Sequence, residues 1–286
     1  LNGNKYEYYH DFENYLLIGT DATGNNKNGA DYQGSMADFL MLVIVDKTEN
    51  TYSFLQFNRD TMTEVALIDH NGEGEATANI QLCTAHWYGG NREQSCENTV
   101  KSVKKLLGGI QIDGYYELNM SEIPKLNSMV DGVTVTLEDD FSKKYPKMKK
   151  GATINLDDEQ AYAYVHDRYG VGDEENTSRM KRQQQYMTGF FKKLQEKVKA
   201  NPNYANEVFE SLQDVSTTDI AIGKISNISN IFASGTDKGI FELAGKSKIG
   251  QALGDEMDHM EFYVNKKAMV STMSELFGIV EQKNKE

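Results

Sequence analysis

Three charged residues flank two apolar runs in the first quarter of this 286-residue sequence. Residues 39–45 and 52–57 have the length of strands and are rich in β-branched or aromatic side chains. Asp38 precedes the first run, and Arg59 and Asp60 follow the second. A short polar connection between the runs predicts an antiparallel hairpin, in which the start of one strand meets the end of the other. We therefore expect these charges to gather at one edge of a sheet, where a site could form.

A further apolar run is expected to bring another acid to this edge. Tyr15–Gly19 predicts a buried strand, and Asp21 follows it closely. If this strand lies parallel to residues 52–57, Asp21 joins Asp38 and Arg59. An acidic pair at a sheet edge is a candidate metal site. The alternative is that the acids cap strand ends or are ordinary surface charges.

A second group of polar residues lies in the longest predicted helix, residues 177–200. Arg179, Arg182 and Gln183 are three and four positions apart, so they lie near one helix face. This face is in the first turns, where backbone N–H groups and the helix dipole favour an anion. The spacing predicts a phosphate site. The alternative is a solvated basic turn balanced by the acidic residues 173–175.

Alternating strands and helices predict an α/β fold, a three-layer α/β/α sandwich with a mixed central β-sheet. The expected helix N-caps are Ser95 for residues 96–107, Asp157 with Gln160 as a capping box, and Thr177 or Ser178 for the long helix. Residues 61–85 show no clear pattern. The chain after residue 200 predicts further helices and one late strand, Glu261–Val264.

Composition limits the classes of function. Hydrophobic residues make up 39% and charged residues 26%, as in ordinary soluble domains. The net charge of −13 argues against a nucleic-acid partner, so an anionic ligand needs a local basic cluster. No apolar run is long enough to span a membrane, although a start at Leu1 suggests a removed signal or anchor. We expect Cys83 and Cys96 to be buried free thiols, with a disulfide as the alternative.

Seven motifs, in this order and spacing, resemble the LytR–CpsA–Psr family. They are LLIGTD, MADFLMLV, SFLQFNRDTM, YGG, GVTV, LDDEQAYAYVHDR and SRMKRQQ. They cover residues 15–194, and FYVNKKAMVSTMSELF is similar to the family's closing strand and helix. The resemblance implies a lead-in over residues 1–14 after a membrane anchor, a catalytic core over residues 15–200, and carboxy-terminal elements over residues 201–286 packed on the same domain.

The resemblance also implies an activity. Such enzymes of the Gram-positive cell surface transfer a glycopolymer from a polyprenyl-pyrophosphate carrier to a peptidoglycan sugar hydroxyl and release polyprenyl phosphate. The lipid tail is expected in a hydrophobic pocket, with arginines and Mg²⁺ holding the pyrophosphate at its mouth. A pyrophosphatase side activity is expected as well. The location implied is the extracellular face of the cell membrane.

The matching motifs assign roles to particular residues. Asp21 and Asp38 match the magnesium-binding acids, and Mg²⁺ takes one or two carboxylates with phosphate oxygens and water. The expected catalytic residues are Asp38, Arg59 and Arg168. The expected pyrophosphate ligands are Arg59, Gln81, His166, Arg168, Asp173, Arg179, Arg182 and Gln183. Asp38 or Asp173 would accept the proton of the attacking hydroxyl, and the alternative role of Arg59 is a structural ion pair with Asp38.

The chain departs from the family pattern at three or four basic positions, one of them Thr23 in the early loop, where arginine is frequent. Met36 stands where arginine is usual, Gln81 where lysine is common, and His166 where the first of two paired arginines is expected. A neighbouring anion would favour protonated His166, and Lys27 or Arg92 could replace lost charge. These losses motivate the alternative of a non-catalytic module that binds a polyprenyl lipid or cell-wall polymer. A transcriptional regulator is the third possibility, which the acidic composition and the absence of a helix-turn-helix pattern disfavour.

Overall fold

The structure, a computed structural model, describes residues 5–7, 11–21, 32–74 and 76–281. The chain divides into two compact units. Unit 1 consists of residues 1–118, 216–220 and 234–286, and unit 2 consists of residues 119–215 and 221–233. Among the described residues, no helix combines the length and the apolar composition needed to cross a membrane.

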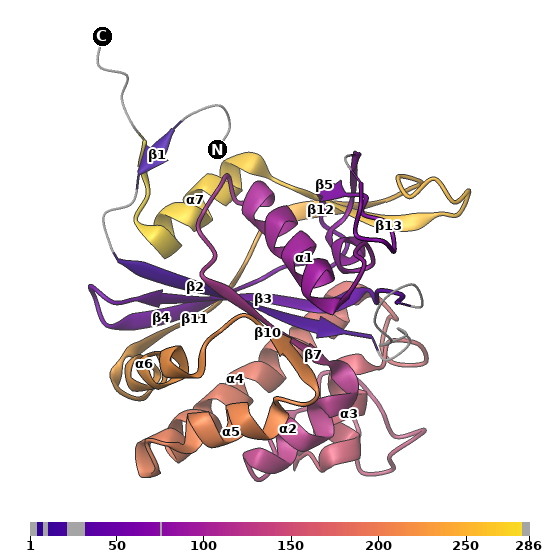
Figure 1. The fold of residues 1–286 in the computed structure, drawn as a ribbon. Coiled ribbons are helices and arrows are strands. Elements are labelled where there is room, and N and C mark those ends of the chain that lie inside the picture. The colour runs from indigo at the N-terminus through magenta and orange to yellow at the C-terminus, as the bar shows by residue number, and fades with distance from the viewer. Residues whose placement is uncertain (1–4, 8–10, 22–31, 75, 282–286) are drawn as a thin grey trace. The chain divides into compact units, whose positions relative to one another are not determined.

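Unit 1 is built on a six-stranded sheet with the order β10-β7-β2-β3-β4-β11 (Figure 1). The strands are β2 (Phe12–Thr20), β3 (Ala37–Asp46), β4 (Thr51–Gln56), β7 (Gly114–Asn119), β10 (Ser216–Thr218) and β11 (Thr236–Glu242). Strand β3 pairs antiparallel with both β2 and β4, whereas β11 pairs parallel with β4, so the sheet is mixed. The predicted hairpin and the mixed α/β class, with helices flanking a mixed central sheet, are therefore confirmed.

One face of this sheet forms the main core of unit 1. Leu40, Leu42 and Ile44 alternate along β3, and all three are at most 1% exposed. They pack in one cluster with residues of α1 (Arg92–Leu106) and α7 (Lys266–Phe277). Burying a side chain of this size stabilises a fold by about 1.5–3 kcal/mol. This alternation fixes the register of β3, because a shift by one residue would turn these side chains to the other face of the sheet.

The rest of unit 1 contains strands that the sequence did not predict. β5 (Met62–Ala66) and β6 (Thr77–Gln81) form a hairpin followed by the short 3-10 helix η2 (Leu82–His86). β12 (Gly245–Gly250) pairs with β13 (His259–Val264), and β1 (Tyr6–Glu7) pairs with β14 (Val280–Glu281). The predicted late strand, Glu261–Val264, is confirmed as part of β13. The expectation that it is the single strand after residue 200 was wrong, because strands such as β12 carry little apolar alternation and are specified by their partners.

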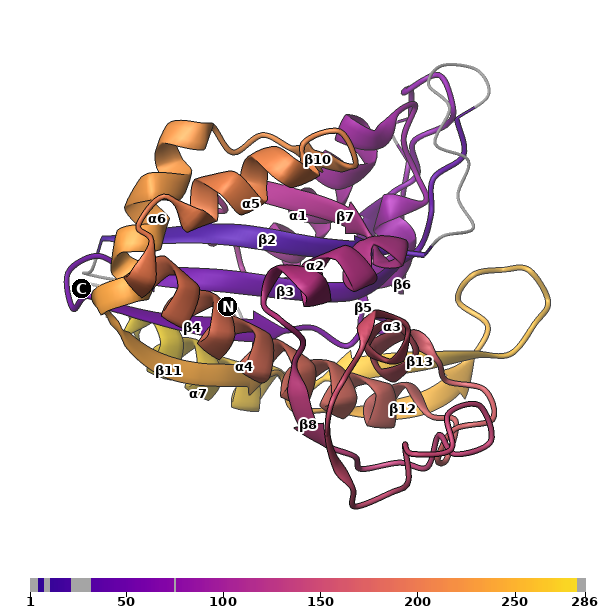
Figure 2. The same cartoon turned by 90° about the horizontal axis from the view of Figure 1, so that it is seen from below.

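Unit 2 is mainly helical (Figure 2). Its helices are α2 (Ile123–Met129), α3 (Asp158–His166), α4 (Asn176–Ala200), α5 (Tyr204–Leu212) and α6 (Ile222–Ser234), with the 3-10 helix η3 (Met120–Glu122) and the hairpin β8 (Thr134–Thr136) with β9 (Thr153–Asn155). Tyr164 of α3 and Tyr186 of α4 are buried in its core. The predicted capping box of Asp157 and Gln160 is present at α3.

Two predicted helix starts were wrong. Helix α1 begins at Arg92 because the Asn91 side chain accepts a hydrogen bond from the Gln94 N–H at 2.8 Å. Ser95 lies inside the helix, and its hydroxyl accepts a hydrogen bond from Tyr32. Helix α4 begins at Asn176, so the proposed caps at positions 177 and 178 are already helical. Cys83 and Cys96 are free and buried, as predicted.

Candidate active site

Asp38 occupies an irregularity in the pairing of β2 with β3. Gly19 pairs with Phe39, whereas Thr20 pairs with Ala37, so Asp38 is an extra residue without a register partner. Such a β-bulge redirects side chains and is common beside functional sites. The Asp21 N–H donates to the Met36 carbonyl at 3.1 Å, which fixes the end of β2 beside the start of β3.

Strands β2 and β4 run in the same direction because both are antiparallel to β3. The ends of β2 and β4 therefore lie at the same edge of the sheet as the start of β3. Asp21, Asp38 and Arg59 stand at these three strand ends. The predicted gathering of Asp38, Arg59 and Asp60 at this edge is confirmed by the contacts of Arg59 with both carboxylates.

Arg59 makes four polar contacts within this edge. Its Nη1 forms an ion pair with Asp38 Oδ1, and its Nε lies 3.6 Å from Asp60 Oδ1. Its Nη2 lies 2.9 Å from Met36 Sδ and 3.1 Å from Cys83 Sγ. The Arg59 side chain is 16% exposed, so it can still be reached from solvent. The alternative of an ion pair with Asp38 is observed, and such a pair is also compatible with binding a phosphate.

The charge of Arg59 is maintained by the neighbouring carboxylates. Burial opposes the charged guanidinium, but Cys83, Asp38 and Asp60 outweigh that effect and raise the pKa of Arg59. Burial also raises the pKa of the Cys83 thiol, although Arg59 counteracts this. The thiol is therefore neutral near pH 7, and the carboxylates, not a thiolate, balance the arginine.

The backbone of residues 59–61 is held on both sides. The Cys83 N–H donates to the Arg59 carbonyl at 2.9 Å, and the Phe262 N–H donates to the Asp60 carbonyl at 2.7 Å.

Gln81 lies at the end of β6, where its Nε2 donates to the Met260 carbonyl at 3.2 Å. Its Oε1 is buried and accepts no hydrogen bond from the described residues. Gln81 thus offers an acceptor, whereas the lysine expected here from the family resemblance would offer a cation.

A buried carboxylate on β7 was missed by the sequence analysis. Glu117 is 1% exposed, accepts a hydrogen bond from the Thr20 hydroxyl at 2.7 Å and forms an ion pair with Arg92. A glutamate within the apolar strand 114–119 was the available signal, because a buried acid requires a partner. Arg92, considered as a replacement for lost charge, is engaged in this pair. Lys27, the other candidate, lies outside the described residues.

Unit 2 contains the remaining predicted residues, with Arg182 at their centre. Arg182 is 1% exposed, and its Nε donates to the Tyr164 carbonyl at 2.9 Å. Its Nη2 donates to the Asp167 carbonyl, and its Nη1 forms a 2.5 Å ion pair with Asp139. Arg182 therefore ties the end of α3 to the loop that carries Asp139. Asp139 was missed, since its relation to Arg182 depends on the tertiary fold.

Arg179 and Gln183 are also buried in the first turns of α4. Arg179 donates to the Asn176 side chain at 2.9 Å, and Gln183 donates to the Val165 carbonyl at 3.1 Å. The alternative of a solvated basic turn is wrong for Arg179 and Arg182, because both side chains are removed from water.

The segment between α3 and α4 carries the accessible residues of the predicted set. The Arg168 guanidinium stacks on the Tyr169 ring at 4.6 Å and forms no ion pair with any described carboxylate. His166 Nδ1 lies 3.3 Å from Asp167 Oδ1. Asp173 accepts hydrogen bonds from the Glu175 N–H at 2.9 Å and the Ser178 hydroxyl at 2.8 Å. These bonds lower the pKa of Asp173.

The donor set at the sheet edge fits Mg²⁺ in kind. Asp21 and Asp38 supply two carboxylates from neighbouring strand ends, and Mg²⁺ normally completes its octahedron with water and phosphate oxygens. No group of three or more His, Cys, Asp or Glu side chains suited to a metal ion occurs among the described residues. A site that needs the substrate to complete its coordination is consistent with this set.

The comparisons define the class of fold. The structure of TagT bound to LI-WTA shares 20% identity over 94% of this chain and 91% of that chain, with a TM-score of 0.67. TagV of B. subtilis shares 19% identity over 94% and 98%, with a TM-score of 0.68. Protein gbs0355 of Streptococcus agalactiae shares 20% identity over 95% and 90%, with a TM-score of 0.73. At these low sequence identities, the comparisons show that the folds are alike. A search of the curated proteins gave no match.

The family follows from the sequence itself. The model of the LytR_cpsA_psr family matches residues 2–277, which is nearly the whole chain. The chain belongs to the LytR–CpsA–Psr family. Membership supports cell-wall glycopolymer transfer at the level of the family.

Proposed function

We propose that this protein transfers a glycopolymer from a polyprenyl-pyrophosphate carrier to a sugar hydroxyl of peptidoglycan and releases polyprenyl phosphate. The observation that carries the proposal is the Asp38–Arg59 pair at the bulged start of β3. It combines a carboxylate with a partly exposed guanidinium, which can bind phosphate through two parallel hydrogen bonds. Because the polyprenyl chain is an apolar lipid, we place the reaction at a membrane surface, on the extracellular face.

The surroundings of three arginines support a role for each. Arg59 neutralises the pyrophosphate while Asp60 and Met36 hold its guanidinium in place. In unit 2, Arg168 is the proposed direct phosphate ligand, because its charge is not balanced by a described carboxylate. Arg182 has a positioning role, because its donors are already bound to the Tyr164 and Asp167 carbonyls and to Asp139. It holds the Asp167 carbonyl and the loop that carries Asp139 in place.

Asp21 and Asp38 would hold Mg²⁺. When bound, the ion supplies positive charge that stabilises negative charge on the phosphoryl oxygens. The residues of the chain orient the substrate and keep Arg59 aligned.

The proposed reaction is a displacement at phosphorus. The oxygen of the sugar hydroxyl attacks the phosphorus that is bonded to the glycopolymer. The bond from this phosphorus to the oxygen that bridges the two phosphates breaks, and polyprenyl phosphate leaves with that oxygen. The hydroxyl proton passes to a carboxylate. Asp38 is favoured over Asp173 because it lies beside Arg59, the residue proposed to neutralise the pyrophosphate.

A second candidate is a module that binds the lipid or polymer without reaction. The observation in its favour is the contact of Met36 with Arg59, where an uncharged thioether occupies a position that is usually basic. Purified protein incubated with a polyprenyl-pyrophosphate-linked glycopolymer, peptidoglycan and Mg²⁺ distinguishes the two. Transfer predicts polymer on the peptidoglycan and free polyprenyl phosphate by mass spectrometry. Retained lipid without either product would establish the binding module instead.

A further inference from the structure

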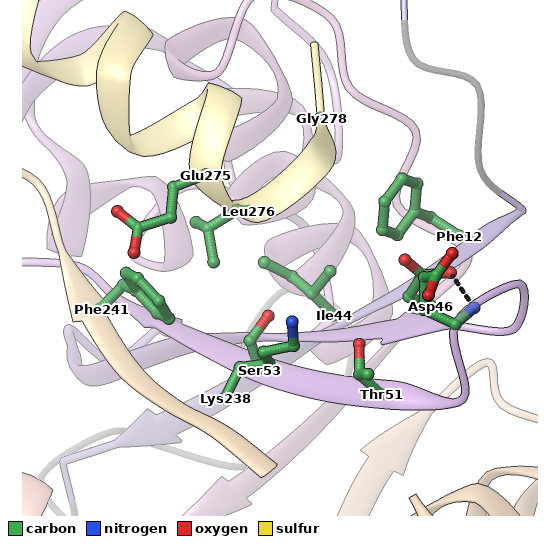
Figure 3. Close-up of a pocket in the computed structure, with 11 residues that line it drawn as sticks. Phe12, Ile44, Asp46, Thr51, Ser53, Lys238, Phe241, Glu275, Leu276 and Gly278 are labelled. Carbon is green, nitrogen blue, oxygen red and sulfur yellow. Dashed lines mark hydrogen bonds between the residues drawn. The ribbon is translucent and has the colours of Figure 1, made fainter. Parts of the chain in front are cut away.

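A pocket of about 290 Å³ lies in unit 1 (Figure 3). It is at the end of β3 and the start of β4, whereas the candidate active site is at the start of β3 and the end of β4. It opens between the end of α7 and strands β3, β4 and β11, and Ile44, Ser53 and Leu276 contribute to its lining. Ser53 and Arg59 are six positions apart, and an extended chain of that length spans about 20 Å. The pocket is therefore separate from the candidate active site.

The pocket exists because the apolar pattern of the sheet face is interrupted. Ser53 pairs with Ile44 and follows the same face as Leu55, which is fully buried beneath the helices. Ser53 is 6% exposed, yet its hydroxyl forms no hydrogen bond with any described residue, although it lines the pocket. Because this hydroxyl faces the pocket, a polar group of a bound ligand can take the place of water as its hydrogen-bond partner.

A β-bulge directs a lysine into the same pocket. Asp237 pairs with Tyr52 and Ile240 with Phe54, so Lys238 and Gly239 both stand opposite Ser53. Gly239 has a φ of +88°, a conformation that favours glycine and permits the bulge. The Lys238 amine points into the pocket in Figure 3 and has no ion pair with a described carboxylate. Lys238 and Ser53 together offer donors for one carboxylate.

The opposite wall of the pocket favours a cation. Glu275 extends from the last turn of α7 toward the pocket (Figure 3) and forms no ion pair with a described residue. The helix ends two residues later, and the negative end of its dipole adds to the charge of Glu275. Ile44, Leu276 and Phe241 provide apolar surface between the two charged walls.

We propose that this pocket binds a small zwitterion with an apolar side chain, an amino acid or dipeptide, with its carboxylate at Lys238 and Ser53 and its ammonium group at Glu275. The pocket volume is just below the usual range for ligand pockets, about 300–1,000 Å³, which suits a ligand of this size. The single lysine beside several acids disfavours a polyanion such as a phosphate-rich chain.

Titration calorimetry with leucine, alanyl-leucine, N-acetyl-alanyl-leucine and alanyl-leucine amide tests the proposal. We expect saturable binding of at least one zwitterion and a loss of about tenfold or more in affinity when either charged end is blocked. Lys238→Met should remove the preference for a free carboxylate, and Glu275→Gln the preference for a free ammonium group. Because both side chains are exposed, neither change should affect folding.

The exposed residues Lys246 and Glu256, which lie outside the pocket lining, provide the matched controls. Lys246→Met and Glu256→Gln should bind like the unmodified protein. The proposal is overturned if neither zwitterion binds, if the blocked compounds bind equally well, or if Lys238→Met and Glu275→Gln leave the affinities unchanged.

Discussion

The Met36 sulfur lies 2.9 Å from Nη2 of Arg59 and contacts one edge of the guanidinium. The Asp38 carboxylate forms an ion pair with the same guanidinium. Met36 stands where the family resemblance leads us to expect arginine, so a neutral, polarisable contact takes the place of the expected second cation. One arginine with one close carboxylate partner leaves less net positive charge for a pyrophosphate than two arginines would.

Met36→Arg should therefore strengthen binding of a polyprenyl-pyrophosphate analogue by about tenfold at low salt, as expected for one added charge-assisted contact. The gain should shrink at high ionic strength, because exposed charges are screened. Met36→Leu is the control, since it keeps the volume and adds no charge. Equal affinities for Met36→Arg and Met36→Leu would show that this position does not contact the anion.

Arg59→Ala should abolish transfer, because it removes the guanidinium that neutralises the pyrophosphate. It should also lower the free energy of unfolding by about 2–3 kcal/mol, since Asp38 loses its buried partner. Transfer assays and urea unfolding measure the two effects. Arg59→Lys keeps the charge without the planar fork and should retain a small part of the activity. Full transfer by folded Arg59→Ala protein would remove Arg59 from the site.

Arg168→Ala should reduce transfer by at least about tenfold, as expected for one charge-assisted phosphate contact. The free energy of unfolding should change by less than about 0.5 kcal/mol, because this side chain is only partly buried and contacts Tyr169. Lys181→Ala, an exposed cation on α4, is the matched control and should leave both quantities unchanged. An equal loss of activity in both variants would indicate a general electrostatic effect.

Arg182→Leu should destabilise the protein by about 3–5 kcal/mol, because it leaves Asp139 and the Tyr164 and Asp167 carbonyls without a buried donor. The measurement is urea unfolding followed by circular dichroism. Lys181→Leu is again a suitable control on the same helix. Native stability in Arg182→Leu would mean that water can replace the guanidinium and that Arg182 is free for another role.

The free energy of unfolding should depend on pH through the Asp167 carboxylate. Burial tends to raise its pKa, but hydrogen bonds from His166 and Lys144 outweigh burial and lower the pKa from the ordinary value of 3.8. A folded pKa below the unfolded one stabilises the fold above pH 3.8, and this contribution is lost as the pH falls through the folded pKa. Asp167→Asn should be less stable than the unmodified protein at pH 6, and the difference should shrink below pH 3.8. A constant difference across that range would contradict the prediction.

Several features were predictable because they depend on neighbours in the chain. The alternation of Leu40, Leu42 and Ile44 predicts one buried strand face, since side chains of a strand alternate with period two. Asp157 and Gln160 predict the start of α3, because a capping box needs only residues three apart. The hairpin predicts that Asp38 and Arg59 meet, because antiparallel pairing brings those ends together.

Other features depend on residues far apart in the sequence, so only the tertiary structure decided them. The bulge at Asp38 arises from the register against β2, and the bulge at Lys238 arises from the register against β4. The burial of Arg182 depends on carbonyls of the preceding helix and loop and on Asp139, 43 residues away. Residue types and spacing by themselves determined which charges this protein has near its strand and helix ends. Packing decided which of them are neutralised inside the fold and which stay accessible, because desolvation and pairing depend on three-dimensional neighbours.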